Sequence, residues 1–500
     1  MYNKYKPLRN LIRQFGLEES LQTIWFYMQH IFSNKSLPPK LQPYDDNLRP
    51  VDVRRLIQPW QLSILAREMI LHAAPIGSRS LASWKYMAMV LDKISTISES
   101  FTPPLNEIDA LNLELHRVGH QQFPWQSKTT IADLMRYMLV YQHEALQYIF
   151  ERTIGAPHKD FFYLGFAVRG RFEREAWLNT DTDYSVVGIS KKTSDIFFRR
   201  VVCSIEGLRQ ETIKTQQYGP AWGYTFNPLQ ATPLVALDPI HPNRVYCPIP
   251  AFAMERISSG LFYDLASAQG FDHAFGDAFQ AYVGRVIEEI GTAHPLQVLP
   301  ECSYHVGKRI KHGIDWALTD TSANLFIECK TKRMTVDAKT TADGVALNDQ
   351  LDILADAVCQ NYSNIRDALE GRSRWPVNTL PTYNLLVTLE DWMLFSNFSY
   401  DRLRSRVKER LLSAGLNSSL LDEIPYTIAS AAEFEMICCA IRDVGINHFF
   451  SMKTDAAHAS WLVSTYSKHY YLDACQRAQL MFDTAFQAFF RGRAPAEAML

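Results

Sequence analysis

Hydrophobic residues in the segment 274–290 recur every three to four positions, a spacing that predicts an amphipathic helix. A short apolar run at 296–299 follows and predicts a strand. Helical spacing returns between 347 and 369, and the continuous apolar run 383–389 is typical of a buried strand. Because a hairpin-like stretch at 313–330 lies between these segments, the predicted order is helix, strand, hairpin, helix, strand.

The stretch 313–330 has the composition of a β-hairpin. Apolar residues with high strand propensity occupy 313–319 and 325–330, and a polar, turn-forming cluster separates them at 320–324. We expect the hairpin to fold symmetrically about residues 321 and 322. This symmetry fixes which side chains of the two strands face each other.

The predicted register brings charged side chains together. Asp315 lies directly opposite Glu328, and facing residues of an antiparallel pair are roughly 4.5 to 5.5 Å apart. Because side chains alternate along a strand, Glu328 and Lys330 project on one face and Cys329 on the other. Two carboxylates at this separation repel, and a hard divalent cation such as Mg²⁺ would remove the repulsion. The hairpin therefore predicts a metal site with two carboxylates and one ammonium.

This order of elements, with the pattern D-x12-E-x-K on the hairpin, resembles the PD-(D/E)xK restriction-endonuclease-like superfamily. Its members include restriction enzymes, Holliday-junction resolvases and recombination nucleases. The resemblance covers roughly 271–450 and implies a mixed α/β fold with an αβββαβ core. It also implies that Asp315 and Glu328 hold Mg²⁺ or Mn²⁺, with the Cys329 carbonyl as a further ligand. Lys330 then orients or activates the attacking water, and DNA is the substrate.

The same resemblance directs attention to two helices. Many family members carry a Glu near the start of the first helix, where this chain has Gln280, which can hydrogen-bond a metal-bound water but adds no charge. Glu288 and Glu289, about two turns further along, are either substitutes or the solvated end of the helix. On the second helix, Gln360 and Tyr362 are candidates for contacts near the scissile phosphate. An ordinary position on the helix surface is the alternative for both.

The apolar context of Glu328 and Lys330 strengthens the prediction of a metal site. Both residues follow the apolar run 325–327, and charges in a buried strand are costly unless they are paired or bound to a metal. The alternative is a structural Glu328–Lys330 ion pair at a sheet edge. Basic residues bracket the hairpin and form either a phosphate-binding rim or a solvated face. These residues are Lys308, Arg309, Lys311, Lys332 and Arg333.

Composition narrows the class of protein. Hydrophobic residues make up 47% of the 500 positions, which suits two to four globular domains at about 100 to 200 residues each. The formal net charge is only −2, so binding to nucleic acid would depend on a local basic patch. The eight cysteines include no C-x-x-C pair, which argues against a zinc ribbon or a secreted disulfide framework. Without a signal-like N-terminus or an apolar run of about 18 residues, we expect a cytoplasmic protein.

The chain divides into four parts of different pattern. Residues 1–155 are mainly helical, and residues 156–250 form a mixed α/β region that ends in a proline-rich linker. The nuclease-like domain occupies 251–450, and residues 451–500 form a helical C-terminal segment. Further helices are predicted at 60–73, 81–97, 131–150, 400–414, 431–444 (with Ser430 as N-cap) and 457–490, and further strands at 161–166, 184–189 and 424–428.

Two other functions stay open. Asp181 and Asp183 form a D-x-D pattern that could bind Mg²⁺ for nucleotidyl transfer, and a polar turn is the alternative. The second possibility is a catalytically inactive nuclease fold that binds nucleic acid or protein, an idea that Gln280 encourages.

The chain contains no phosphate-loop, H-E-x-x-H or G-x-S-x-G motif, so a motor would have to be a separate subunit. A helical region joined to a nuclease looks like bacterial defence proteins that act on phage or plasmid DNA. In such proteins cleavage is restrained until a trigger arrives. DNA, a regulatory or motor subunit and a second copy of the chain are therefore the expected partners, and no membrane is expected.

Overall fold

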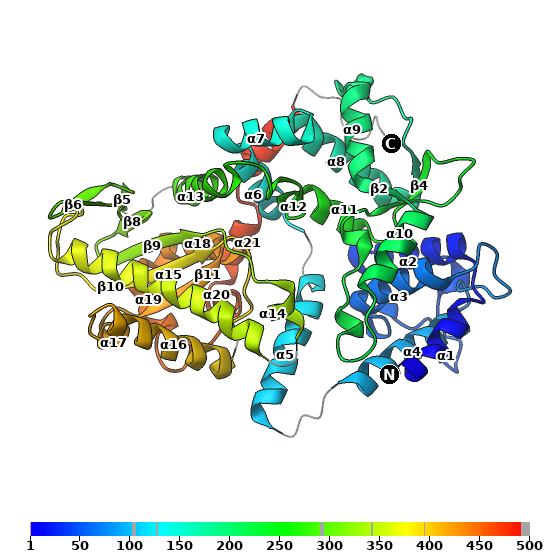
Figure 1. Ribbon diagram of the computed structural model, residues 1–500, viewed down its shortest axis with the longest axis horizontal. Coiled ribbons are helices and arrows are strands. Elements are labelled where there is room, and N and C mark those ends of the chain that lie inside the picture. The colour runs from blue at the N-terminus through cyan, green and yellow to red at the C-terminus, as the bar shows by residue number, and fades with distance from the viewer. Residues whose placement is uncertain are drawn as a thin grey trace.

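The stretch 313–330 folds as a hairpin within a five-stranded sheet in the computed structural model (Figure 1). The structure describes residues 2–102, 107–126, 129–290, 295–341, 344–394 and 396–491. The strand order of the sheet is β11-β10-β9-β8-β5. Its strands are β5 (Gln297–Pro300), β8 (Trp316–Thr319), β9 (Asn324–Lys330), β10 (Thr382–Thr388) and β11 (Tyr426–Ser430).

The sheet is mixed. Strand β8 is antiparallel to both β5 and β9, whereas β10 runs parallel to both β9 and β11. Strand β9, which carries Glu328 and Lys330, lies between β8 and β10. Strand β10 pairs with it through Lys330, whereas β8 pairs with it as far as Ile327. Parallel neighbours require crossover connections, and helices supply them here.

The register of the hairpin confirms the prediction. Trp316 pairs with Ile327, and the pairing continues to the turn, where the backbone N–H of Asp320 donates to the Ala323 carbonyl at 3.1 Å. The Asp320 carboxylate also accepts the backbone N–H of Ser322 at 2.7 Å. A short polar side chain therefore closes the turn by bonding to its own backbone.

Helices cover both faces of the sheet (Figure 1). Leu325 and Ile327 belong to the core that contains α13 (Phe271–Glu289) and α18 (Ala431–Val444). Phe326 points the other way, into the core formed with α15 (Val345–Leu369) and α16 (Ser396–Ser413). The predicted helices at 274–290, 347–369, 400–414 and 431–444, the strands at 296–299, 383–389 and 424–428 and the Ser430 cap are confirmed within a few residues.

The remaining elements are mainly helical. Short strands form a second sheet of order β1-β4-β3-β2 and a two-stranded ribbon of β6 and β7. The strands are β1 (Trp177–Asn179), β2 (Val202–Ser204), β3 (Leu234–Ala236), β4 (Arg244–Tyr246), β6 (Tyr304–Val306) and β7 (Arg309–Lys311). The helices are α1 (Tyr2–Ile12), α2 (Leu17–Ser33), α3 (Pro59–His72), α4 (Trp84–Phe101), α5 (Ile108–Gln122), α6 (Ile131–Tyr141), α7 (Glu144–Ile154), α8 (His158–Arg174), α9 (Lys191–Val201), α10 (Ile205–Thr215), α11 (Pro250–Ile257), α12 (Leu261–Leu265), α14 (Val336–Thr340), α17 (Leu420–Glu423), α19 (Ile446–Lys453), α20 (Val463–Tyr470), α21 (Leu472–Gln479) and α22 (Asp483–Phe490).

Hydrophobic cores connect parts that are distant in sequence. Helices α1 to α4 share a core with α10 and β3, in the blue lobe of Figure 1. Helices α6 to α8 instead share the core of α13 and α18 beside the five-stranded sheet. The four-part domain division stays a prediction, and residues 492–500 of its last part lie outside the described residues. Within the described ranges, no helix has the length and apolar content needed to cross a membrane.

Two predicted strands are wrong. Residues 161–166 lie in α8, where Phe161, Leu164 and Val168 are buried at helical spacing, so tertiary packing overrides the strand propensity of the aromatic residues. Residues 184–189 form a short 3₁₀ turn and a loop. The Asp183 carboxylate accepts the backbone N–H of Ser185 at 2.9 Å, and this local bond starts a turn in place of a strand.

Two predicted helices are divided. The segment 131–150 forms α6 and α7 with a break at residues 142 and 143. The segment 457–490 contains the three short helices α20, α21 and α22. In both segments apolar periodicity marks buried positions but does not show where the chain turns.

A buried ion pair joins the N-terminal half to the sheet domain. Arg136 of α6 binds Glu435 of α18 through two N···O contacts, both of 2.8 Å. Tyr282 of α13 donates its hydroxyl to the same carboxylate at 2.6 Å. All three side chains are buried. Their packing holds α6, α13 and α18 together on one face of the sheet.

Removing one partner of this buried pair should destabilise the protein strongly. Arg136→Met leaves the Glu435 carboxylate buried without its cation, and we expect a loss of about 3–5 kcal/mol in the free energy of unfolding. Arg477→Met is the control, because it removes an exposed partner of Asp443 on α18 and should cost about 0–1 kcal/mol. Urea unfolding followed by circular dichroism measures both. Equal losses would contradict a special role for Arg136.

Candidate active site

Three acidic residues lie side by side at one end of the sheet. Trp316 of β8 pairs with Pro300 of β5 and with Ile327 of β9. Extending both registers by one residue aligns Glu301, Asp315 and Glu328 across the three strands. Alternation places Glu328 on the α15 face with Phe326. The Glu301 carboxylate, by contrast, is bonded to Gln280 of α13, which covers the other face.

Asp315 is held by the backbone of the neighbouring strand. Its carboxylate accepts the N–H of Cys329 at 2.6 Å. Burial raises the pKa of Asp315, and the charge of Glu301 acts in the same direction, whereas the Cys329 N–H and Lys330 oppose the shift. The structure therefore holds this carboxylate in a fixed orientation, and its burial disfavours the charged form.

Glu328 is the most constrained group of the row. Its Oε1 lies 2.6 Å from Nζ of Lys330, and its side chain is only 4% exposed. Burial, followed by the charge of Asp315, raises the pKa of Glu328 to about 7, against the attraction of Lys330. Its Oε2 is buried and has no hydrogen-bond partner among the described residues. One oxygen is paired, and the other is ready for a ligand.

Lys330 connects the acidic row to α15. Its Nζ also lies 3.4 Å from Oε1 of Gln360, which is exposed on that helix. Tyr362 does not join the site: it is buried and donates its hydroxyl to the Ile424 carbonyl at 2.7 Å. The prediction for Tyr362 is wrong because residues two apart on a helix point about 200° apart.

Gln280 reaches the row through Glu301. Its Nε2 donates to Oε2 of Glu301 at 3.0 Å, and its backbone carbonyl accepts the indole N–H of Trp316 at 3.0 Å. Glu301 is not part of the D-x12-E-x-K pattern, so the sequence does not single it out. It follows the predicted strand at 296–299 and therefore lies near the end of that strand. Glu288 and Glu289 are exposed further along α13, which agrees with their reading as its solvated end.

The side chain and the backbone of Cys329 lie in different surroundings. Its thiol packs against the α13 core and also hydrogen-bonds to the Asp315 carboxylate, and burial, followed by the charges of Asp315 and Glu328, raises the thiol pKa. Only its backbone carbonyl could act as a ligand beside Asp315 and Glu328. The pairing of Glu328 with Lys330 on one face agrees with the predicted alternation.

The donor set fits one kind of metal. Within the described ranges, no group of three or more His, Cys, Asp or Glu side chains is arranged to hold an ion. Zinc sites usually need such a set, whereas Mg²⁺ is commonly bound by one or two carboxylates, water and substrate phosphate. Asp315 and the unpartnered Oε2 of Glu328 provide two carboxylates of this kind.

The bracketing basic residues separate into two groups. Lys311 is bonded to Asp367 of α15 at 2.5 Å and fixes the β6–β7 ribbon to that helix, and Arg333 is paired with Glu390. The others are exposed, and they are Lys308, Arg309 and Lys332. Only this exposed group can form a rim for phosphate.

The D-x-D pattern lies in an exposed turn after β1. Both oxygens of Asp183 accept bonds from Ser185, through its N–H and its hydroxyl, each at 2.9 Å. Asp181 pairs with Lys191 at 3.4 Å and also accepts from Asn243. These bonds are those of the polar turn that was the alternative to a nucleotidyl-transfer site.

Comparisons with protein-family models, with curated proteins and with solved structures find no match for this chain. The chemistry of the acidic row is therefore inferred from its geometry.

The raised pKa of Glu328 predicts a pH-dependent stability. Its pKa in the folded protein is about 7 against an ordinary 4.5, so in this range the folded chain keeps a proton that the unfolded chain releases. The folded state is therefore favoured most below the ordinary value, and this stability is lost as the pH rises toward 7. We expect the melting temperature of the wild type in chelator to fall relative to Glu328→Gln over this range.

The same series repeated with Mn²⁺ should reverse the trend, because the metal binds the deprotonated carboxylates and stabilises the folded state. The increase in melting temperature should be largest at the high end of the pH range and absent in Glu328→Gln. Parallel curves for the two proteins in chelator would show that Glu328 has an ordinary pKa.

Proposed function

We propose that this chain is a Mg²⁺-dependent nuclease that hydrolyses phosphodiester bonds of DNA. Asp315 and Glu328 would hold the cation, with the Cys329 carbonyl as an additional ligand, and Lys330 would lie beside the attacking water. The observation that carries the proposal is the state of Glu328. This carboxylate is buried in a central strand, is repelled by Asp315 and has one oxygen without a partner.

The arrangement of elements supports the resemblance to the PD-(D/E)xK superfamily. Helix α13 precedes the antiparallel strands β5, β8 and β9, and α15 then leads to β10, which is parallel to β9. Within the five-stranded sheet, this order supports the αβββαβ core that the resemblance implies. Glu328 and Lys330 lie on β9, and Asp315 immediately precedes β8.

A structural ion pair explains less. A Glu328–Lys330 pair at a sheet edge would be solvated, but β9 has neighbours on both sides. A buried pair stabilises only when hydrogen bonds satisfy its remaining atoms, and Oε2 of Glu328 is not satisfied. Asp315 adds repulsion to Glu328, although its carboxylate also accepts the Cys329 N–H. A divalent cation compensates all of these costs together.

The residues divide the chemistry among them. Bound Mg²⁺ would supply Lewis acidity at the phosphate and would offset the negative charge that develops there. Asp315 is oriented by the Cys329 N–H, so its carboxylate needs little reorganisation on binding. Lys330 is 32% exposed, and Glu328 and Gln360 hold its ammonium where solvent and substrate can reach it. The ammonium is placed to orient a water and to stabilise negative charge on the phosphate.

The exposed basic residues suggest how DNA approaches. Lys308 and Arg309 lie on the β6–β7 ribbon, and Lys332 follows β9 directly. Because the net charge of the chain is −2, attraction to DNA must come from such local groups. Binding should therefore weaken as salt increases.

Cleavage assays test the proposal directly. With Mg²⁺ present, the wild type should cut linear, circular or branched DNA, and Asp315→Asn, Glu328→Gln and Lys330→Ala should each lower the rate by about 10²-fold or more. Lys332→Ala is the matched control, since it removes an exposed ammonium two residues away and should change the rate only a few-fold. The rates are measured on end-labelled and closed substrates.

Three results would count against the proposal. Unchanged cleavage by Lys330→Ala would remove Lys330 from the mechanism. DNA binding in chelator without any Mg²⁺-dependent cleavage would favour the binding-module alternative. Incorporation of labelled nucleotide by Lys330→Ala would instead point to Asp181 and Asp183.

A further inference from the structure

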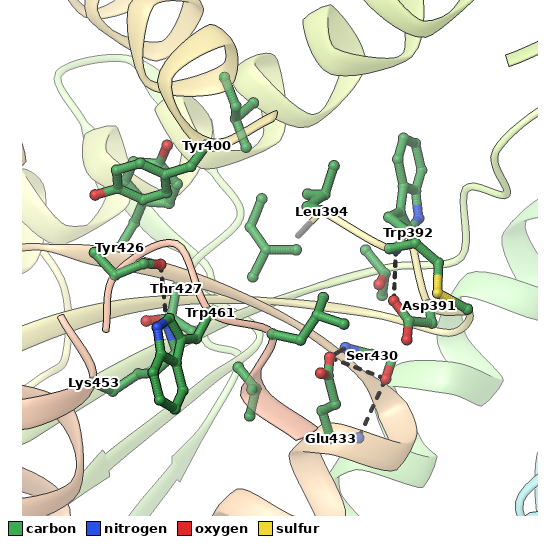
Figure 2. Close-up of a pocket in the computed structure, with 17 residues that line it drawn as sticks. Asp391, Trp392, Leu394, Tyr400, Tyr426, Thr427, Ser430, Glu433, Lys453 and Trp461 are labelled. Carbon is green, nitrogen blue, oxygen red and sulfur yellow. Dashed lines mark hydrogen bonds between the residues drawn. The ribbon is translucent and has the colours of Figure 1, made fainter. Parts of the chain in front are cut away.

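A pocket lies along β11, from Tyr426 at its start to Ser430 at its end, and reaches the carboxyl end of β10 at Thr388 (Figure 2). Thr388, which ends β10, is in register with Lys330 on one side and with Ser430 on the other. Neighbouring strands are about 4.8 Å apart, so this pocket begins about one strand spacing from Lys330. In open α/β sheets, ligands bind at this end of parallel strands.

Aromatic side chains form much of the lining. Figure 2 shows Tyr426 and Trp461 on one side of the pocket and Trp392 on the other. Trp461 is 37% exposed, so part of its ring is open to a ligand. Trp392 Nε1 and the Tyr426 hydroxyl are buried without hydrogen-bond partners among the described residues. The pocket thus combines flat apolar surfaces with unsatisfied polar atoms.

The charged side chains of the pocket offer mainly hydrogen-bond acceptors. One oxygen of Asp391 accepts the backbone N–H of Met393 at 2.7 Å, and the other has no donor among the described residues. Glu433 is already occupied, because it accepts the N–H groups of Ser430 at 2.9 Å and of Ser464 at 2.8 Å.

The single cation of the pocket lining is also engaged. The ammonium of Lys453 donates to the carbonyls of His458 and Ala459 at 3.0 and 3.1 Å. A phosphate would meet two carboxylates here and a cation already committed to backbone. The pocket therefore suits an uncharged planar group that offers N–H donors.

We infer that this pocket receives a nucleobase of the DNA strand that is cut, one or two nucleotides from the scissile phosphate. The inference rests on the proposed nuclease function. A base presents a flat face to Trp461 and points its N–H edge across the pocket toward Asp391, which Figure 2 places at the other end, while its phosphate stays outside with the exposed lysines and Mg²⁺. Cytosine, adenine and guanine carry an exocyclic amine that suits a carboxylate, and thymine does not.

Binding of oligonucleotides to the full chain tests the inference independently of cleavage. Single-stranded oligonucleotides with one abasic site at successive positions are titrated by fluorescence anisotropy in Ca²⁺, in the Lys330→Ala background. One position should lose affinity by about tenfold when its base is absent, as expected for a stacked base. Trp461→Ala should remove this difference between intact and abasic DNA. Trp177→Ala, a similarly exposed tryptophan on β1, should retain it.

Base identity tests the polar side of the pocket. At the sensitive position, cytosine or adenine should bind more tightly than thymine, and Asp391→Asn should abolish this preference. Free cytidine, adenosine and thymidine, measured by equilibrium dialysis, identify the other source of a base. Binding of free nucleosides that depends on Trp461, together with DNA affinity that is insensitive to every abasic position, would overturn the assignment to the cut strand.

The two proposals fail in different ways. If the abasic effect depends on Trp461 but the wild type cuts no DNA, the pocket stands and the nuclease function falls. If the wild type cuts DNA and no abasic position depends on Trp461, the pocket assignment falls alone. Absence of any DNA binding overturns both.

Discussion

The burial of Glu328 in a central strand is the constraint on which the site depends. Strand β9 is covered by helices on both faces and by strands on both sides, so a carboxylate there cannot reach bulk water. The fold gives it one cationic neighbour, Lys330, and one anionic neighbour, Asp315. Such an arrangement costs stability that an apolar side chain would not cost. A cost of this kind is expected where a strand end serves chemistry, since functional sites concentrate perturbed ionisable groups.

Much of this arrangement was predictable from the sequence because it is local. The turn at residues 320–323 fixes the hairpin register, and the register alone sets Asp315 opposite Glu328. The alternation of side chains then decides that Lys330 and Glu328 share a face. The helix that starts after Ser430 was equally predictable, because Ser430 and Glu433 have the sequence spacing of a capping box and form one in the structure. Each of these predictions needs only residues within about one element of each other.

What the sequence left undetermined depends on contacts between distant elements. Glu301 joins the acidic row only because β5 pairs with β8, a pairing that no local pattern specifies. Tyr362 looked like a partner of Gln360 until the position of α15 turned it toward Ile424. The run 161–166 is apolar throughout and fits a strand or a helix equally well, and only packing against the core of α13 decides for the helix. The Arg136–Glu435 pair, which joins residues 299 apart, was equally out of reach.

The parallel part of the sheet explains why the acidic row and the aromatic pocket belong together. Strands β9, β10 and β11 end at Lys330, Thr388 and Ser430, which are far apart in the chain but in register across the sheet. Crossover helices return the chain to the same side each time, so every strand delivers its last side chains to one edge. Strand β5 runs in the same direction as β9 and ends just before Glu301, whereas the antiparallel β8 begins just after Asp315, so both carboxylates lie at that edge. One edge therefore collects the carboxylates and the ammonium, and the aromatic pocket extends from the Thr388 end of that edge along β11 to Tyr426.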